Sequence, residues 1–288
     1  MLLRPVIGGH AAVAGGLAKA GLAYLERSAA AAVQVYVSNP RGWALSAGDP
    51  AQDEAFRAGC AERDIPSYVH ATLLVNLGSP TAATVERSIA TLDHALRRAA
   101  AIGARGVVFH AGNAVTADHD PLGQLRAVLL PLLDRAAAEG LPKLLVEPSA
   151  GGGRALAARV EDLGPYLDAV DRHPWLGVCF DTCHAWAAGH DLAAPGGLRG
   201  TLDTLVATVG ADRLWLVHAN DSRDPVGSLR DRHEAVGKGT IGEAAFAELL
   251  AHPAAARVPM IVETPNDDGA GHPADIARLR SLIPAAAG

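Results

Sequence analysis

Short apolar runs alternate with longer, alanine-rich segments of helical periodicity along the whole chain. The apolar runs predict buried strands, and the segments between them predict helices. We expect strands at 5–8, 32–37, 67–70, 106–110, 143–147, 176–181, 214–218 and 259–263. We expect helices at 14–27, 52–63, 82–102, 122–139, 160–171, 198–209, 243–250 and 274–282. The pattern therefore predicts eight successive strand–helix units.

Eight units in 288 residues, at about 36 residues each, favour an α/β fold of the (β/α)8 TIM-barrel type. The alternative is an open, doubly wound sheet, but no G-x-G-x-x-G pattern follows the first predicted strand. No shift in composition marks a boundary, so we expect residues 1–288 to form a single domain. In a TIM barrel the active site lies at the carboxyl ends of the strands.

Seven of the eight predicted strands end in, or lead directly to, a histidine or an acidic residue. Packing gives no reason for this, and four carboxylates at one barrel mouth would repel one another unless cations neutralised them. Two further sources of ligands are His184, three residues after Asp181, and the Asp231-Arg232-His233 segment. The candidate metal ligands are therefore His70, His110, Glu147, Asp181, His184, His218, Asp231, His233 and Glu263.

Five histidines and four carboxylates favour zinc, with manganese or iron as alternatives. At roughly four ligands per ion, and with a carboxylate able to bridge two ions, nine ligands predict two or three ions. His10 also ends a strand, but it would be surplus as a ligand, so we expect it to support a ligand or to contact substrate. The remaining histidines are expected to be ordinary surface or capping residues: His94, His119, His173, His190, His252 and His272.

Composition limits the possible settings of the protein. Hydrophobic residues make up 49% of the chain, yet no apolar run is long enough to predict a membrane helix and nothing resembles a signal peptide, so we expect a cytoplasmic protein. Cys60, Cys179 and Cys183 lack the paired spacing of a zinc site and are expected to be packed thiols. The net charge of −6 taken alone argues against a nucleic-acid partner.

Four segments are the most distinctive in the chain: GVCFDTCHAWAAGHD at 177–191, HANDSRDPVGSLRDRHEAVGKGTIG at 218–242, GGHAAVAGGLAKA at 8–20, and VHATLLVNLGSP at 69–80. With them, essentially the whole chain resembles the endonuclease IV family, the zinc-dependent apurinic/apyrimidinic endonucleases of base excision repair. The resemblance implies a TIM barrel that holds three zinc ions and acts on duplex DNA containing abasic sites, and we expect a monomer. The implied zinc ligands are His70, His110 and Glu147 for the first ion, Glu147, Asp181, His218 and Glu263 for the second, and His184, Asp231 and His233 for the third.

The implied reaction is hydrolysis of the phosphodiester 5′ to the abasic site, which leaves a 3′-OH. Zinc brings the pKa of a bound water down to about 7, so no separate general base is needed. The resemblance gives Glu147 the catalytic role of bridging two of the ions. Three zinc ions also revise the charge argument. They would cancel the net charge of −6, and six positive charges against four carboxylates would leave the mouth locally positive, which favours a phosphodiester there.

The resemblance also implies DNA contacts in two loops, 39–43 and 72–76. Arg41 matches the family's arginine, whereas Leu73 stands where the family usually carries a tyrosine. Leu73 could still act as an apolar wedge in the duplex. Pro148 and Ser149 replace a usual Asn-Thr pair, and we expect neither departure to touch a metal ligand. His10 is the third residue assigned to substrate contact.

Two other functions fit part of the pattern. Metal-dependent sugar isomerases and epimerases of TIM-barrel type also place Glu, Asp, His and Glu at the ends of their last four strands, but the other five candidate ligands would then be unexplained. A metal-stabilised protein that binds damaged DNA without turnover is the other alternative, because Leu73 and Pro148 depart from the family pattern.

Overall fold

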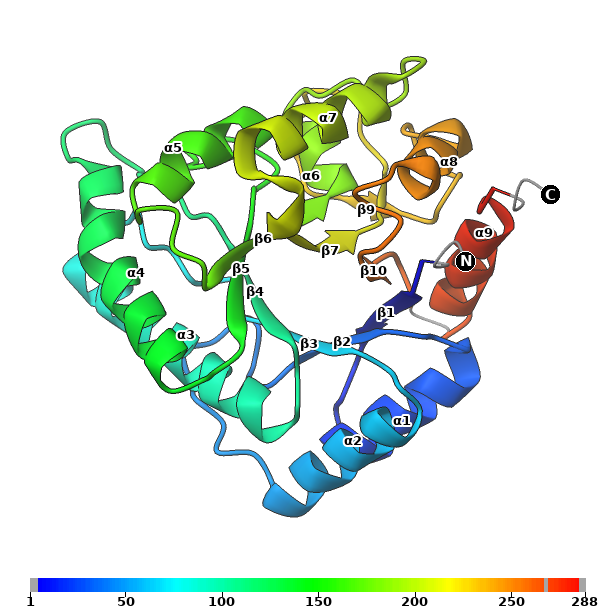
Figure 1. Ribbon diagram of the computed structural model, residues 1–288, viewed down its shortest axis with the longest axis horizontal. Helices are drawn as coiled ribbons and strands as arrows, with labels where there is room; N and C mark the ends of the chain where they lie inside the picture. The colour runs from blue at the N-terminus through cyan, green and yellow to red at the C-terminus, as the bar shows by residue number, and fades with distance from the viewer. Residues whose placement is uncertain (1–4, 267–268, 285–288) are drawn as a thin grey trace.

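The computed structural model describes residues 5–266 and 269–284, which form a closed barrel of eight parallel strands inside a ring of helices (Figure 1). Strand pairs follow chain order around the barrel, and the last strand closes the ring against the first. The TIM barrel predicted from the sequence is confirmed. The strands are β1 (Ile7–Ala11), β2 (Val33–Tyr36), β3 (Ser67–His70), β4 (Gly106–His110), β5 (Lys143–Glu147), β6 (Leu176–Asp181), β7 (Leu214–His218) and β10 (Met260–Val262).

Eight helices of the described chain follow the eight strands and cover the outside of the barrel (Figure 1). Two of them begin at an Asp-Pro pair: Asp49 and Asp120 accept hydrogen bonds from backbone N–H groups of the first turn, and the prolines need no donor there. None of the helices in this part of the chain has both the length and the apolar character needed to cross a membrane. The eight are α1 (Leu17–Ser28), α2 (Pro50–Glu62), α3 (Ala82–Ala101), α4 (Pro121–Ala138), α5 (Leu163–Asp168), α7 (Gly197–Val209), α8 (Glu243–Ala251) and α9 (Gly271–Ser281).

The structure corrects the sequence prediction at two elements. The first strand runs from Ile7 to Ala11 rather than over 5–8, so His10 lies inside it. The helix expected at 160–171 is a 3-10 turn, η1 (Val160–Asp162), followed by a short α5 that ends at Asp168. It ends early because Asp171 and Arg172 adopt left-handed backbone angles, which a helix cannot continue through.

The loops at the carboxyl ends of the strands contain structure that the sequence pattern did not predict. A short helix, α6 (Thr182–Ala187), follows β6 immediately, and a two-stranded hairpin of β8 (Asp221–Ser222) and β9 (His233–Glu234) follows β7. A second 3-10 turn, η2 (Ala211–Arg213), lies at the opposite end of the barrel, directly before β7. Both α6 and the hairpin matter for function, because they carry candidate ligands that no barrel strand supplies.

Side chains fill the barrel interior in two layers. The lower layer is apolar and buried, and consists of Ala32, Tyr68, Val108, Leu145, Cys179, Leu216 and Ile261. Because strand side chains alternate between the two faces, the residue two positions further along faces the same interior. In β2 to β7 and after β10 these are, in order, Gln34, His70, His110, Glu147, Asp181, His218 and Glu263. A polar layer therefore lies directly above an apolar one, at the mouth of the barrel.

Candidate metal centre

The first group of candidate ligands is His70, His110 and Glu147, at the ends of β3, β4 and β5. Glu147 Oε2 lies 3.3 Å from His70 Nε2 and 3.6 Å from His110 Nε2. Strand register explains the meeting, since His110 pairs with Glu147 across β4 and β5. One atom from each residue lies within 4.8 Å of the others, which is close enough for the three to hold one ion.

The second group contains Glu147 again, with Asp181, His218 and Glu263. His218 Nδ1 lies 2.9 Å from Glu147 Oε1, 3.2 Å from Glu263 Oε2 and 3.7 Å from Asp181 Oδ2. Glu147 thus turns one carboxylate oxygen toward each group, and its side chain is fully buried between them. It occupies the position of a bridging ligand.

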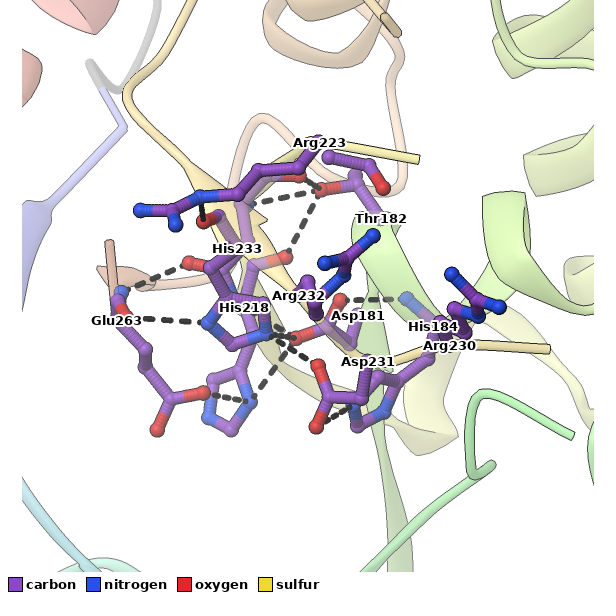
Figure 2. A network of polar contacts seen from close by, with 12 residues as sticks. Asp181, Thr182, His184, His218, Arg223, Arg230, Asp231, Arg232, His233 and Glu263 are labelled. Carbon is purple, nitrogen blue, oxygen red and sulfur yellow. Dashed lines mark hydrogen bonds and ion pairs between the residues drawn. The ribbon is translucent and has the colours of Figure 1, made fainter. Parts of the chain in front are cut away.

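The third group, His184, Asp231 and His233, comes from α6 and the β7–α8 loop (Figure 2). Asp231 Oδ2 lies 3.2 Å from His184 Nε2, and Asp231 Oδ1 lies 2.9 Å from His233 Nε2. Asp181 lies beside this group, since its Oδ2 is 3.9 Å from His233 Nε2. All nine predicted ligands therefore meet at one end of the barrel, and Asp181 connects the second group to the third.

Backbone carbonyls fix the orientation of three of these histidines. His70 Nδ1 lies 2.7 Å from the carbonyl of Ala71, and His233 Nδ1 lies 3.0 Å from that of Glu263. A carbonyl can only accept, so Nδ1 carries the hydrogen and Nε2 is the nitrogen that faces the centre and is available to a metal ion. His184 is held in the same way by the carbonyl of Pro148, at 3.0 Å. The expectation that Pro148 touches no ligand is therefore wrong, although the contact comes from its backbone.

The carboxylates of the centre favour positive charge close to them. Burial would lower the pKa of His184, but Asp181, Asp231 and Glu147 raise it well above its ordinary value. Burial would likewise raise the pKa of Glu147, but His218 and His184 hold it well below its ordinary range. The Glu147 carboxylate is therefore stabilised by cationic neighbours, whereas burial raises the pKa of Asp181 above its ordinary value. A metal ion would stabilise both carboxylates better than protonated imidazoles do.

The donor set fits bound metal. His233 Nε2 is buried and has no hydrogen bond of acceptable geometry, although Asp231 Oδ1 lies only 2.9 Å away. Two possible ligand atoms at this distance, with the imidazole nitrogen left without a well-formed hydrogen bond, are arranged like ligands of a common ion. His110 is also suitable, because burial lowers its pKa to about 4 and so leaves a neutral imidazole at pH 7.

The cysteines and the other histidines mostly behave as packed residues. Cys60, Cys179 and Cys183 are buried and unpaired, and burial raises the pKa of Cys179 and of Cys183 to about 12. The thiols of Cys179 and Cys183 do lie within 4.8 Å of candidate ligand atoms. Three of the six histidines expected on the surface or at caps are buried instead, and they support neighbouring loops: His190, His252 and His272.

The residues assigned to DNA contact fall into two places. Arg41 is exposed and its guanidinium has no hydrogen-bond or ion-pair partner among the described residues, while Leu73 is 44% exposed. Their loops are joined, because the Pro40 carbonyl accepts a hydrogen bond from Leu73 N at 2.9 Å. His10 lies elsewhere: its side chain is only 12% exposed, and Nδ1 is 3.2 Å from Glu263 Oε1. The structure thus places His10 at the metal centre rather than on the surface loops.

Sequence reasoning missed three polar residues that support the centre. Asn220 is buried, donates to Asp181 Oδ2 at 2.7 Å and accepts from the backbone N–H of Glu263 at 2.8 Å. Gln34 contacts His218 and Glu263 within the polar layer. Asp221 binds backbone N–H groups of the loop that ends at α8. The only feature of the sequence that could have drawn attention to Gln34 is an amide side chain inside the otherwise apolar VQVY segment, where a buried polar group needs a partner.

A parallel barrel with histidines and carboxylates at its mouth defines the class, and residues 22–282 match a family described as a xylose isomerase-like TIM barrel. Within this class, the chain is 54% identical to a protein of Streptomyces coelicolor named "Probable endonuclease 4", over 98% of this chain and 96% of the relative. A protein of Methanoculleus marisnigri with the same name is 37% identical, over 96% and 98%. The chain belongs to the endonuclease IV family.

Solved structures agree with this assignment. The crystal structure of endonuclease IV from Thermus thermophilus superposes with a TM-score of 0.85 at 34% identity and covers 97% of this chain and 99% of that one. A 3-keto-D-glucoside 4-epimerase from E. coli superposes with a TM-score of 0.69 at 16% identity, covering 96% and 100%. The second likeness shows the shared fold alone.

Proposed function

We propose that this protein is a DNA-repair nuclease that hydrolyses the phosphodiester 5′ to abasic sites in duplex DNA, with three zinc ions per chain. The names of its relatives support an endonuclease of this family. The observation that carries the proposal is the meeting of three histidine–carboxylate groups at one mouth, in which the buried Glu147 is shared by the first two groups and Asp181 lies beside the third. We propose His70, His110, Glu147, Asp181, His184, His218, Asp231, His233 and Glu263 as the ligands.

Bound zinc would supply Lewis-acid stabilisation of the phosphoryl oxygens and a water of lowered pKa. The chain's own residues prepare the site for this chemistry. The histidines present oriented nitrogens, and Glu147 offers one oxygen to each of two groups and so fixes how they lie relative to each other. Fixed ligands keep the reacting groups aligned, which is how a rigid barrel accelerates a displacement at phosphorus.

Arginines around the third group supply a surface for the DNA backbone. Arg223 Nε donates to the His233 carbonyl, and Arg230 and Arg232 flank Asp231 in the sequence (Figure 2). All three side chains are at least half exposed, and Arg232 and Arg230 share the single acceptor Asp224. Cations placed beside a site for a phosphodiester increase affinity for the charged backbone without reading sequence.

The sugar isomerase alternative explains fewer residues. It needs only the second group, and it assigns no role to the fully formed first group or to the group that α6 and the hairpin bring together. The epimerases that share this fold do so at 16% identity, which supports the barrel and not the activity. The DNA-damage binder differs from the proposal only in turnover, so an assay for cleavage separates them.

The test is a nicking assay on an end-labelled duplex with one central abasic site, with an undamaged duplex of the same sequence as the control. We expect cleavage of the abasic strand only, directly 5′ to the lesion, with a 3′-OH that a polymerase can extend. Chelation should abolish cleavage and added zinc should restore it. Binding without cleavage in excess zinc would favour the damage binder, and cleavage that survives full chelation would exclude the metal mechanism.

The metal content provides an independent prediction. We expect three tightly held zinc ions per chain, because nine ligands with a shared carboxylate satisfy three sites and leave none spare. Elemental analysis of protein purified without chelator measures the number directly. One ion per chain would contradict the trinuclear centre and favour the isomerase.

The exposed side chain of Leu73 leads to a prediction about DNA binding. We expect Leu73→Ala to weaken binding to an abasic duplex by about 10-fold or more, because an inserted apolar side chain offsets an unstacking cost of a few kcal/mol. Arg41→Ala should act in the same direction, whereas Leu73→Tyr should keep or improve affinity. Affinity is measured at fixed salt, with zinc content and melting temperature recorded for every variant.

Leu45 offers a matched control for this experiment. It is 45% exposed and lies in the same loop as Arg41, outside the two segments assigned to DNA contact. We expect Leu45→Ala to bind the abasic duplex like the parent. If Leu73→Ala also binds like the parent but melts at a lower temperature, Leu73 is a packing residue and the wedge must be sought in another loop.

A further inference from the structure

Gln34 is the one polar member of β2 that is completely buried, and its amide lies beside the second group of candidate ligands. Its Oε1 is 3.0 Å from His218 Nε2, and its Nε2 donates to Glu263 Oε1 at 2.6 Å. The same nitrogen lies 3.0 Å from His10 Nδ1. The side chain has no other hydrogen-bond partner among the described residues, so all of its polar contacts go to the centre.

Hydrogen-bonding capacity fixes which end of the amide faces which partner. The Glu263 carboxylate only accepts, so the amide nitrogen must face it and the amide oxygen must face His218. The oxygen in turn only accepts, so His218 Nε2 carries the hydrogen. His218 Nδ1 is then the nitrogen available to a metal ion, and it is the atom that faces Glu147, Asp181 and Glu263.

This arrangement sets His218 apart from the other oriented histidines of the centre. His70, His184 and His233 present Nε2, and each is held through Nδ1 by a backbone carbonyl. His218 is turned the other way round and presents Nδ1, and a side chain takes the place of the carbonyl. The orientation of one imidazole therefore depends on a residue that can be replaced without changing the backbone.

We propose that Gln34 is a positioning residue for the second group of ligands: it holds His218 with Nδ1 toward the carboxylates, holds Glu263 beside it, and so sets the affinity of that group for metal. The proposal rests on the metal-dependent function proposed above. A partner that fixes the far nitrogen of a metal-binding histidine typically contributes about 10–100-fold to metal affinity. Gln34 serves two ligands of the same group.

The test compares the parent with Gln34→Leu and Gln34→Met, which keep the approximate volume and remove the amide. Metal-free protein is titrated with Co²⁺ against a chelator of known affinity, and the visible spectrum reports the coordination of each bound ion. We expect one of the three ions to bind about 10–100-fold more weakly in both variants, with the other two unchanged. Excess zinc should restore nicking in both variants, because the substitutions reduce the affinity for metal and leave the ligands themselves in place.

Tyr68→Phe is the matched control, since Tyr68 pairs with Gln34 across β2 and β3, is similarly buried, and lies in the apolar layer without contact to a ligand. It should bind metal like the parent. Unchanged affinities in both Gln34 variants would overturn the proposal, and so would an equal weakening of all three ions accompanied by a lower melting temperature of the metal-free protein. A parent that binds no metal or fails to nick would instead show that the proposed function is wrong.

Discussion

Glu147→Gln is expected to reduce nicking of an abasic duplex by more than about 100-fold, the upper end of the loss seen when a group that merely supports a ligand is removed. Glu147 is fully buried, and its two oxygens face different ligand groups. Glutamine keeps the shape, but it removes the charge and turns an amide N–H₂ toward one of the groups. Both groups then lose a shared anionic ligand, so metal content should fall together with kcat.

Asp231→Asn provides the comparison for this variant. Asp231 is 46% exposed and contacts only the third group, through His184 and His233. Its loss should therefore weaken one ion and leave the shared pair of groups intact, with a smaller fall in kcat/KM. Both variants are purified, their zinc is counted, and their kcat/KM values are compared at saturating zinc. Equal losses in kcat/KM would show that Glu147 does not have the bridging role.

The fold and the cluster of candidate ligands could be predicted from the sequence because both depend on a repeating pattern. From β3 to β7 each strand ends in a histidine or a carboxylate, Glu263 directly follows β10, and parallel strands bring those ends to one edge. The exceptions show the limit of the pattern. Asp231 and His233 come from a long loop, where only their spacing and the family resemblance drew attention to them.

The supporting residues could not be predicted, because their roles depend on contacts between distant segments. Gln34 meets His218 and Glu263 only once the barrel has closed, and nothing in the VQVY segment indicates either partner. The sequence around Asn220 is typical of a polar turn, yet in the structure the side chain is buried and donates to Asp181. The reversed orientation of His218 is likewise decided by the partner of its far nitrogen, which no sequence pattern encodes.

Asp221→Ala is expected to disrupt the loop that carries the third ligand group. Asp221 is fully buried, and its carboxylate accepts from five backbone N–H groups, those of Ser222, Gly237, Gly239, Ile241 and Gly242. Each buried donor left unpaired costs about 1–3 kcal/mol. Asp221 also pairs with Glu234 in the hairpin that places His233. The segment 223–242 should therefore open locally while the barrel stays folded.

Hydrogen exchange and metal counting together check this outcome. In Asp221→Ala we expect faster amide exchange in 223–242 and the loss of one of three zinc ions, with the other two retained by strand-end ligands. Asp120→Ala is the matched control, because Asp120 also accepts a backbone N–H, from Gly123 at the start of α4, and contacts none of the ligands. Loss of this helix cap should lower the free energy of unfolding by about 1 kcal/mol and leave all three ions bound. Full zinc content and unchanged exchange in Asp221→Ala would mean that the hairpin holds the third group without this carboxylate.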